Sequence, residues 1–298
     1  MSTNVLAALP RRVALLNHPR GALLPRGWRD LTQQIALLAS FSLAYEAIAA
    51  AMHGDRHIAL THARDIVHTE RTLGLFHEDA IQRLTLHAPS LVIDIANWTY
   101  INSQFTVAYI LLAWIYLRHN ASFRTVRDAV LSIDALGLIG YVAYPTAPPR
   151  MLPNLGVVDT VHQTGLDQRS GLIARFADPY AAMPSLHTAY AVLLGGVAAV
   201  LVTRPVIKAL WAAYPTLVVF SIIATGNHFF LDALAGILLA AIALTAQLAL
   251  ARIRKRRARQ TTKAADSRPA NSRPTPTRTT QPAPEIAQPL SLASGPSG

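Results

Sequence analysis

The chain has 298 residues, of which 52% are hydrophobic and only 14% are charged. Soluble domains carry about 25% charged residues, so this composition excludes an ordinary soluble fold and indicates a membrane protein. The absence of cysteine excludes disulfides and thiolate metal sites.

Apolar runs long enough to cross a bilayer recur along the chain. Because one crossing needs about 20 predominantly apolar residues, we predict six spans, at residues 31–52, 91–117, 129–144, 186–203, 206–224 and 229–251. The predicted fold is therefore all-α, a six-helix transmembrane bundle. We expect a basic cytoplasmic segment at 1–30, a membrane domain at 31–252 and a basic, disordered cytoplasmic tail at 253–298.

The two links that this topology places on the extracytoplasmic side differ in composition. Residues 53–89 mix acidic, basic and apolar side chains, which predicts short interfacial helices. Residues 145–182 form a long link rich in proline and glycine, and loops of this length usually serve a function.

Basic residues determine the expected orientation. Six of the eight residues that follow the last predicted span carry positive charge: Arg252, Arg254, Lys255, Arg256, Arg257 and Arg259. Because such clusters stay in the cytoplasm, we expect both termini there and a multi-pass protein of the cell membrane. Nucleic acid is the alternative partner for a basic cluster, but a position beside a membrane helix favours anionic lipid, so we predict no nucleic-acid partner.

Three polar segments, 144–150, 183–187 and 226–232, lie at the extracytoplasmic ends of predicted spans. Ionisable residues in such places indicate a functional site. His228 and Asp232 are four residues apart, so they are neighbours on a helix. An aspartate that orients one imidazole nitrogen leaves the other nitrogen free as a nucleophile. These features predict an extracytoplasmic active site.

The other polar residues of these segments suit phosphoryl chemistry. His187 comes from a different helix and can protonate a leaving oxygen. Arg150 offers a planar fork to two phosphate oxygens. Ser185, at a helix start, and Asn227 can supply further donors. Together with His228, these groups predict attack on a phosphate ester.

The motifs Met183-Pro-Ser-Leu-His187 and His228-Phe-Phe-Leu-Asp232 resemble two motifs of the type 2 phosphatidic acid phosphatase superfamily. Ala147-Pro-Pro-Arg150 and the leucine of the first motif resemble its inositol phosphorylceramide synthase-like, or inositolphosphotransferase, branch. The resemblance implies six membrane helices, no metal, no cofactor and a phosphohistidine intermediate. It also implies a lipid phosphate substrate and these roles: nucleophile His228, its partner Asp232, general acid His187, and phosphate ligands Arg150 and Ser185.

The chain departs from the broader superfamily pattern at four positions. Two phosphate-binding cations are replaced, a lysine by Ala143 and an arginine by Ile222. A proline is replaced by Met151, and a glycine by Leu186. Four arginines of the two outer links are candidates to compensate for the lost cations: Arg71, Arg83, Arg169 and Arg175.

Several alternatives remain open at this stage. A simple lipid phosphate phosphatase, hydrolysing phosphatidic acid or polyprenyl phosphate, has the same motifs. Two histidines and a carboxylate can also hold a metal, although the adjacent Pro-Pro-Arg favours an anion. A transporter or non-catalytic scaffold would use Glu46, Asp94 and Asp134, for which hydrogen bonding inside the bundle is the simpler interpretation. The sequence identifies neither the lipid nor the oligomeric state.

Overall fold

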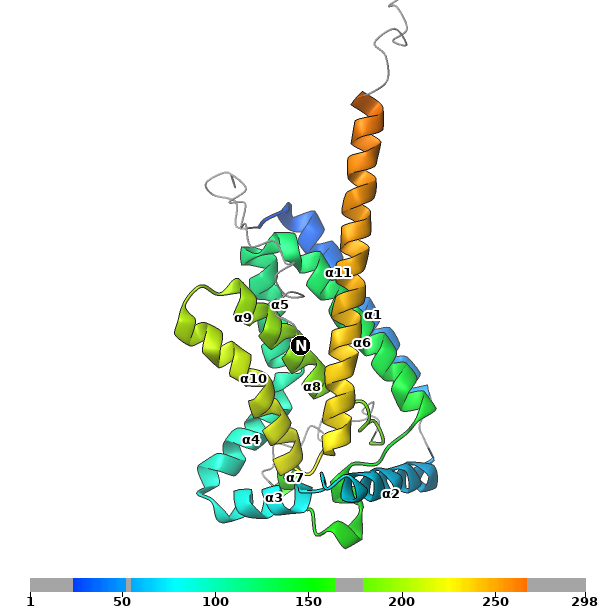
Figure 1. Cartoon of the computed structure of the whole chain (residues 1–298), viewed down its shortest axis with the longest axis vertical. Coiled ribbons are helices and arrows are strands. Elements are labelled where there is room, and N and C mark those ends of the chain that lie inside the picture. Colours follow the sequence, from blue (N-terminus) through cyan, green and yellow to red (C-terminus); the bar gives the residue numbers. More distant parts are fainter. Residues whose placement is uncertain (1–23, 52–54, 164–178, 267–298) are drawn as a thin grey trace, which may run out of the picture. The chain divides into compact units, whose positions relative to one another are not determined.

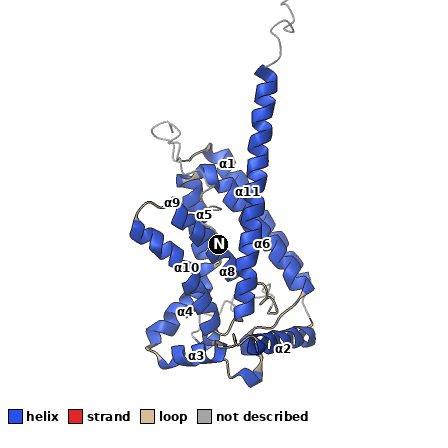
Figure 2. Ribbon diagram, viewed as in Figure 1, coloured by secondary structure: helices blue, strands red, loops and turns tan. Residues whose placement is uncertain are grey.

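The computed structural model of the chain describes residues 24–51, 55–163 and 179–266. These residues form helices and connecting loops, and no strand occurs among them (Figure 2). An isolated β-bridge pairs Thr146 with Ala181. The prediction of an all-α fold is confirmed.

Every predicted span falls on helix (Figure 1). In chain order these helices are α1 (Gly27–Ala51), α4 (Ser90–Ser103) with α5 (Thr106–Arg118), α6 (Asn120–Ala143), α8 (Leu186–Tyr190) with α9 (Gly196–Leu201), α10 (Pro205–Ala224) and α11 (Phe230–Asp266). A π-helical turn, η6 (Ala191–Gly195), joins α8 to α9.

The helices differ in whether they are long and apolar enough to cross a membrane. Among the described residues, α10 and the part of α11 at Phe230–Thr261 are long and apolar enough to cross a membrane. Helices α4 and α5 make a third candidate if they form one span, bent by 53° at the break between them. The segment Leu186–Leu201 is apolar but shorter. These helices indicate a membrane protein, and the count of six crossings stays a prediction.

The chain divides into two compact units, with the boundary between Ile253 and Arg254. The described part of the second unit is the C-terminal end of α11, which continues to Asp266. Arginine, lysine, alanine and glutamine favour helix, and residues 253–266, which we expected to be disordered, continue the helix α11. Residues 267–298 of the predicted tail lie outside the described residues.

The link between the first two predicted spans contains the predicted short helices, α2 (Arg56–Thr72) and α3 (Glu78–His87). Figure 1 shows both crossing the end of the bundle at which α11 begins. Ala59 of α2 is fully buried, and its carbonyl accepts a hydrogen bond from Ala147 N at 3.1 Å. This bond joins α2 to the link that follows α6. In the second link, the described residues form η2 (Pro149–Met151), η3 (Pro153–Leu155) and α7 (Thr160–Gln163).

Glycines of α6 and α11 allow these helices to pack closely against the start of α8. A Cβ atom at Gly137 would lie 2.7 Å from Leu186 Cδ2, and one at Gly140 would lie 2.6 Å from Pro184 Cδ. A Cβ atom at Gly236 of α11 would lie 2.3 Å from Ser185 O. The leucine that departs from the superfamily pattern therefore occupies space left by a glycine on the facing helix.

A hydrogen bond between helices accounts for one of the three acidic residues that a transporter would use. The hydroxyl of Tyr190 lies 2.9 and 3.0 Å from the two carboxylate oxygens of Asp134. This contact joins α6 to α8 and supports a structural role for Asp134 inside the bundle.

Candidate active site

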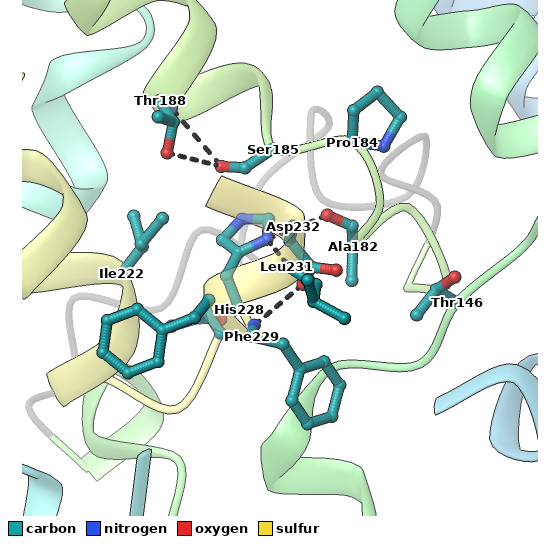
Figure 3. A network of polar contacts seen from close by, with 12 residues as sticks. Thr146, Ala182, Pro184, Ser185, Thr188, Ile222, His228, Phe229, Leu231 and Asp232 are labelled. Atoms are coloured by element: carbon teal, nitrogen blue, oxygen red, sulfur yellow. Dashed lines mark hydrogen bonds and ion pairs between the residues drawn. The ribbon is translucent and has the colours of Figure 1, made fainter. Parts of the chain in front are cut away.

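Main-chain hydrogen bonds bring the three polar segments together. Ser185 N donates to Asp232 O at 3.0 Å, and Arg150 N donates to Gly226 O at 3.1 Å. A third contact joins His228 Nδ1 to Ala182 O at 2.9 Å (Figure 3). Residues separated by more than forty positions thus form one site, with the backbone as its frame.

His228 lies in the turn just before α11 and is only 4% exposed. Because a carbonyl can only accept, its contact with Ala182 O assigns the proton to Nδ1 and leaves Nε2 with its lone pair. Asp232 Oδ2 lies 3.4 Å from the same Nδ1 and accepts a shorter hydrogen bond, 2.8 Å, from Phe229 N. The predicted aspartate is adjacent, but the carbonyl of Ala182 is the nearer partner of the ring.

The protonation of His228 follows from its surroundings. Burial and the charge of nearby Arg150 lower its pKa to about 3, against the opposing hydrogen bond to Ala182. The imidazole is therefore neutral near pH 7, which is the form in which a histidine nitrogen can act as a nucleophile.

His187 reaches the same place from the first turn of α8. Its ring stacks on Tyr100 of α4, with centroids 4.5 Å apart and planes at 21°, and it hydrogen-bonds the Tyr100 backbone. It also meets the His228 ring edge to face, with centroids 5.6 Å apart and planes at 62°. The fold therefore brings together two imidazoles that are 41 positions apart in the sequence.

Ser185 is fully buried and forms the N-cap of α8. Its Oγ accepts from Thr188 N and from Thr188 Oγ1, both at 3.3 Å (Figure 3). Capping by serine satisfies a backbone donor that the first helical turn leaves unpaired. Because both contacts use Ser185 as acceptor, its own O–H remains able to donate.

The Arg150 guanidinium lies between two side chains. Its Nε contacts Asp159 Oδ2 at 3.0 Å, and an Nη donates to Asn227 Oδ1. The amide nitrogen of Asn227 donates to Thr225 Oγ1 at 2.9 Å, which orients the amide oxygen toward the arginine. In this geometry Asn227 holds Arg150, while its own donors are directed at Thr225.

The two positions at which cations are replaced have different environments. Ile222 is fully buried in an apolar cluster that includes Val218, Ile223 and Ala233. Ala143 is exposed at the C-terminal end of α6. An apolar core residue, Ile222, therefore occupies one of the two positions at which a cation is replaced.

The arginines predicted to compensate have other partners or lie outside the described residues. Arg71 lies over the ring of Phe76, 4.9 Å from its centroid. Arg83 pairs with Asp79 at 2.6 Å. Arg169 and Arg175 fall outside the described residues.

Two buried glutamates next to the site were not predicted. Glu70 at the end of α2 accepts from Leu231 N at 2.7 Å, and Glu78 at the start of α3 accepts from Phe230 N at 3.1 Å. Both are fully buried. The mixed charge of their link predicted short interfacial helices, and nothing in the local pattern distinguishes these glutamates from exposed ones.

Gln82 of α3 was likewise not predicted. It donates to Val158 O at 2.9 Å and to Ala224 O at 3.0 Å, and it accepts from Val158 N at 2.7 Å. It thus fixes the second outer link to the end of α10. The next turn contains Gly226, whose φ of 73° suits glycine.

Within the part of the chain that the structure describes, no group of three or more His, Cys, Asp or Glu side chains is arranged to hold a metal ion. The sequence of the chain matches the family model of the PAP2 superfamily over residues 64–246, a segment that contains all three motifs. The match covers more than half of the chain, and the protein belongs to the PAP2 superfamily. Searches of curated proteins and of solved structures found no match.

Members of this superfamily are generally metal-independent phosphatases. Membership indicates a lipid phosphatase or phosphotransferase that acts on lipid phosphates in membranes.

Proposed function

We propose that the protein is an integral membrane enzyme that cleaves a phosphoester of a lipid through a phosphohistidine at His228. The observation that carries this proposal is the pairing of two imidazoles. His228 is held by Ala182 O with its Nε2 unprotonated, and the ring of His187 lies 5.6 Å away, centroid to centroid. A neutral nucleophile beside a potential acid is what a two-step phosphoryl transfer requires.

In the proposed mechanism, Arg150 and the O–H of Ser185 bind phosphate oxygens. His228 Nε2 attacks phosphorus while the bond to the leaving oxygen breaks, and protonated His187 gives its proton to that oxygen. The resulting cationic ring keeps its Nδ1–H on Ala182 O, with the Asp232 carboxylate 3.4 Å from Nδ1. An acceptor O–H then attacks phosphorus, its proton passes to His187, and the N–P bond breaks.

Asn227 serves the phosphate indirectly in this proposal. Its oxygen orients the guanidinium of Arg150, while Asp159 holds Nε of the same group. An arriving phosphate competes with Asp159 for the charge, because a guanidinium binds carboxylate and phosphate through the same fork.

The transferase branch is our first choice for the second step. Inositol phosphorylceramide synthase-like proteins resemble this chain in Ala147-Pro-Pro-Arg150 and in Leu186, and the leucine packs against Gly137 of α6. In a transferase the acceptor is an alcohol such as inositol, and the bound group can be a phosphodiester. A lipid phosphate phosphatase, for which water is the acceptor, is the second candidate.

We also propose the membrane arrangement expected from the sequence. Helix at all six predicted spans supports a six-helix domain at 31–252. The contacts among the motif segments support a common end for α6, α8 and α11, which the charge pattern assigns to the extracytoplasmic side. Both termini would then be cytoplasmic, with 1–30 and 253–298 as flanking segments, in a cell-membrane protein.

Trapping of the intermediate tests this function. Wild-type protein in lipid vesicles, quenched during turnover of ³²P-labelled phosphatidic acid or polyprenyl phosphate, should carry acid-labile phosphohistidine. His228→Ala should carry none and lose about 10⁴-fold or more in turnover, the scale for loss of a nucleophile. His68→Ala, which removes an exposed histidine of α2, is the matched control. Normal turnover in His228→Ala would overturn the proposal.

Product analysis separates the two second steps. A phosphodiester lipid donor is incubated with the protein in water alone and in water with inositol. Formation of an inositol phosphodiester, such as an inositol phospholipid, that depends on His228 favours the transferase. Hydrolysis that inositol does not divert favours the phosphatase.

A further inference from the structure

The first turn of α11 is bound by three acidic side chains. Phe229 N donates to Asp232 at 2.8 Å, Phe230 N to Glu78 at 3.1 Å and Leu231 N to Glu70 at 2.7 Å. Unpaired N–H groups at a helix start attract negative charge, so carboxylates stabilise such a turn. Two of these acidic side chains come from α2 and α3, which cross this end of the bundle (Figure 1).

The two glutamates use their oxygens differently. Glu78 accepts with both, from Phe230 N through Oε1 and from His77 N through Oε2 at 3.0 Å. Glu70 accepts with Oε1 alone. Its Oε2 is buried and receives no hydrogen bond from a protein N–H or O–H donor. Glu70 and Glu78 also contact each other through a side-chain hydrogen bond.

A hydrogen bond between two carboxyl groups requires that one of them carries a proton. Backbone donors occupy both oxygens of Glu78, and only Oε2 of Glu70 is without one. The hydrogen-bond pattern therefore assigns the proton to Glu70 and the charge to Glu78.

Charge around Glu70 favours the same assignment. Acidic groups face it from two elements, Glu78 from α3 and Asp232 from α11, and among the described residues no cation forms an ion pair with either glutamate. Burial, and after it the neighbouring Glu78, raises the pKa of Glu70 to about 9. Two buried carboxyl groups in contact cannot both ionise at neutral pH.

We propose that Glu70 is protonated, donates to Glu78, and with it holds the first turn of α11, so that the pair positions His228 and Asp232. This inference rests on the proposed function for its catalytic consequence only. His228 immediately precedes the bound turn, and a displacement there would move Nε2 relative to His187. The two glutamates touch no reacting atom and are positioning residues.

The unequal roles predict unequal effects of the same substitution. In Glu70→Gln, Oε1 can still accept from Leu231 N, and Nε2 donates to Glu78 as the protonated acid does, so kcat should stay within about twofold. In Glu78→Gln, an amide group replaces an oxygen that accepts from a backbone N–H. We expect kcat to fall by about tenfold or more with little change in KM, because small misplacements of a nucleophile are costly.

The dependence of Tm and kcat on pH distinguishes a protonated Glu70 from a contact that has only a structural role. A group whose pKa is raised in the folded state stabilises most below its unfolded value, near 4.5 for Glu70, and that stability is lost as pH rises toward 9. Wild-type Tm and kcat should therefore fall on the alkaline side. Glu70→Gln has no such proton to lose, so both should stay flatter than in wild type.

The experiment measures kcat, KM and Tm from pH 5 to 10 for wild type, Glu70→Gln and Glu78→Gln. Asp65→Asn is the control and should behave as wild type, because Asp65 is an exposed acidic residue on the same helix as Glu70, α2. Equal losses in the two glutamine variants, or an unchanged alkaline fall of Tm in Glu70→Gln, would overturn the inference. Because Tm needs no substrate, a wild type that forms no phosphohistidine contradicts the proposed function and leaves this test intact.

Discussion

The two halves of the candidate site are held in different ways. The histidine half, His187 and His228, is fixed by backbone carbonyls of Tyr100 and Ala182. The arginine half, Arg150, is fixed by the side chains of Asp159 and Asn227. Main-chain acceptors stay in place when a ligand arrives, whereas side-chain partners can rotate away.

The two halves therefore differ in how far they can adapt during a reaction cycle. A nucleophile gains from a fixed position, because each step requires the same alignment with phosphorus. A phosphate clamp must bind a charged group and later release it, and an exchangeable partner such as Asp159 keeps the guanidinium paired in between. Substitutions in each half of the site test this contrast.

Loss of the second imidazole should have the largest effect of the three. We expect His187→Ala to lower kcat by about 10²- to 10⁴-fold, the usual contribution of a general acid. Tyr100→Leu keeps the backbone carbonyl and removes only the ring that stacks on His187, so its loss should be smaller. Steady-state kinetics on both variants provide the measurement. Equal losses in kcat would mean that the ring of Tyr100, rather than its backbone carbonyl, positions His187.

Removal of the guanidinium should weaken phosphate binding and turnover together. We expect Arg150→Ala to lower kcat/KM by about 100-fold, and Arg150→Lys to recover only part of it, because an ammonium cannot form the bidentate fork. Arg71→Ala, which removes an arginine that lies over Phe76, is the matched control. Normal kcat/KM in Arg150→Ala would show that another cation binds the phosphate.

The smallest effect tests whether Asp159 restrains the clamp. Asp159→Asn keeps the shape of the side chain and removes the charge that competes with phosphate. We expect KM to fall by about two- to fivefold with kcat nearly unchanged, the scale of a partly exposed ion pair. A rise in KM would indicate instead that Asp159 orients Arg150, and that both halves of the site are rigid.

Much of the fold could be predicted from the sequence, since hydrophobic runs and proline- or glycine-rich links mark helices and their ends. The break between α4 and α5 and the extension of α11 to Asp266 were not predicted. Residues 91–117 contain no proline or glycine that would mark a break. The last turns of α11 form because their residues favour helix, but their polar and charged composition gives no hydrophobic pattern from which a helix could be predicted.

The candidate site shows a similar division. His187, His228, Asp232, Arg150 and Ser185 could be selected because ionisable and capping residues are rare beside apolar runs. The nearest partner of His228 could not, because Ala182 contributes only a carbonyl, which every residue has. Tyr100 and the glutamates of α2 and α3 could not be selected either, since their roles come from burial.

The class of fold, the membrane character and the residue types available for phosphoryl chemistry could be predicted from the sequence, because these follow from composition and short-range spacing. Which groups touch depends on the tertiary structure. It paired His228 with a carbonyl, assigned Asn227 to Arg150, packed Ile222 where the superfamily has an arginine, and brought Glu70 against Glu78. Such contacts join segments distant in the chain, and their energies depend on burial and geometry that no local pattern encodes.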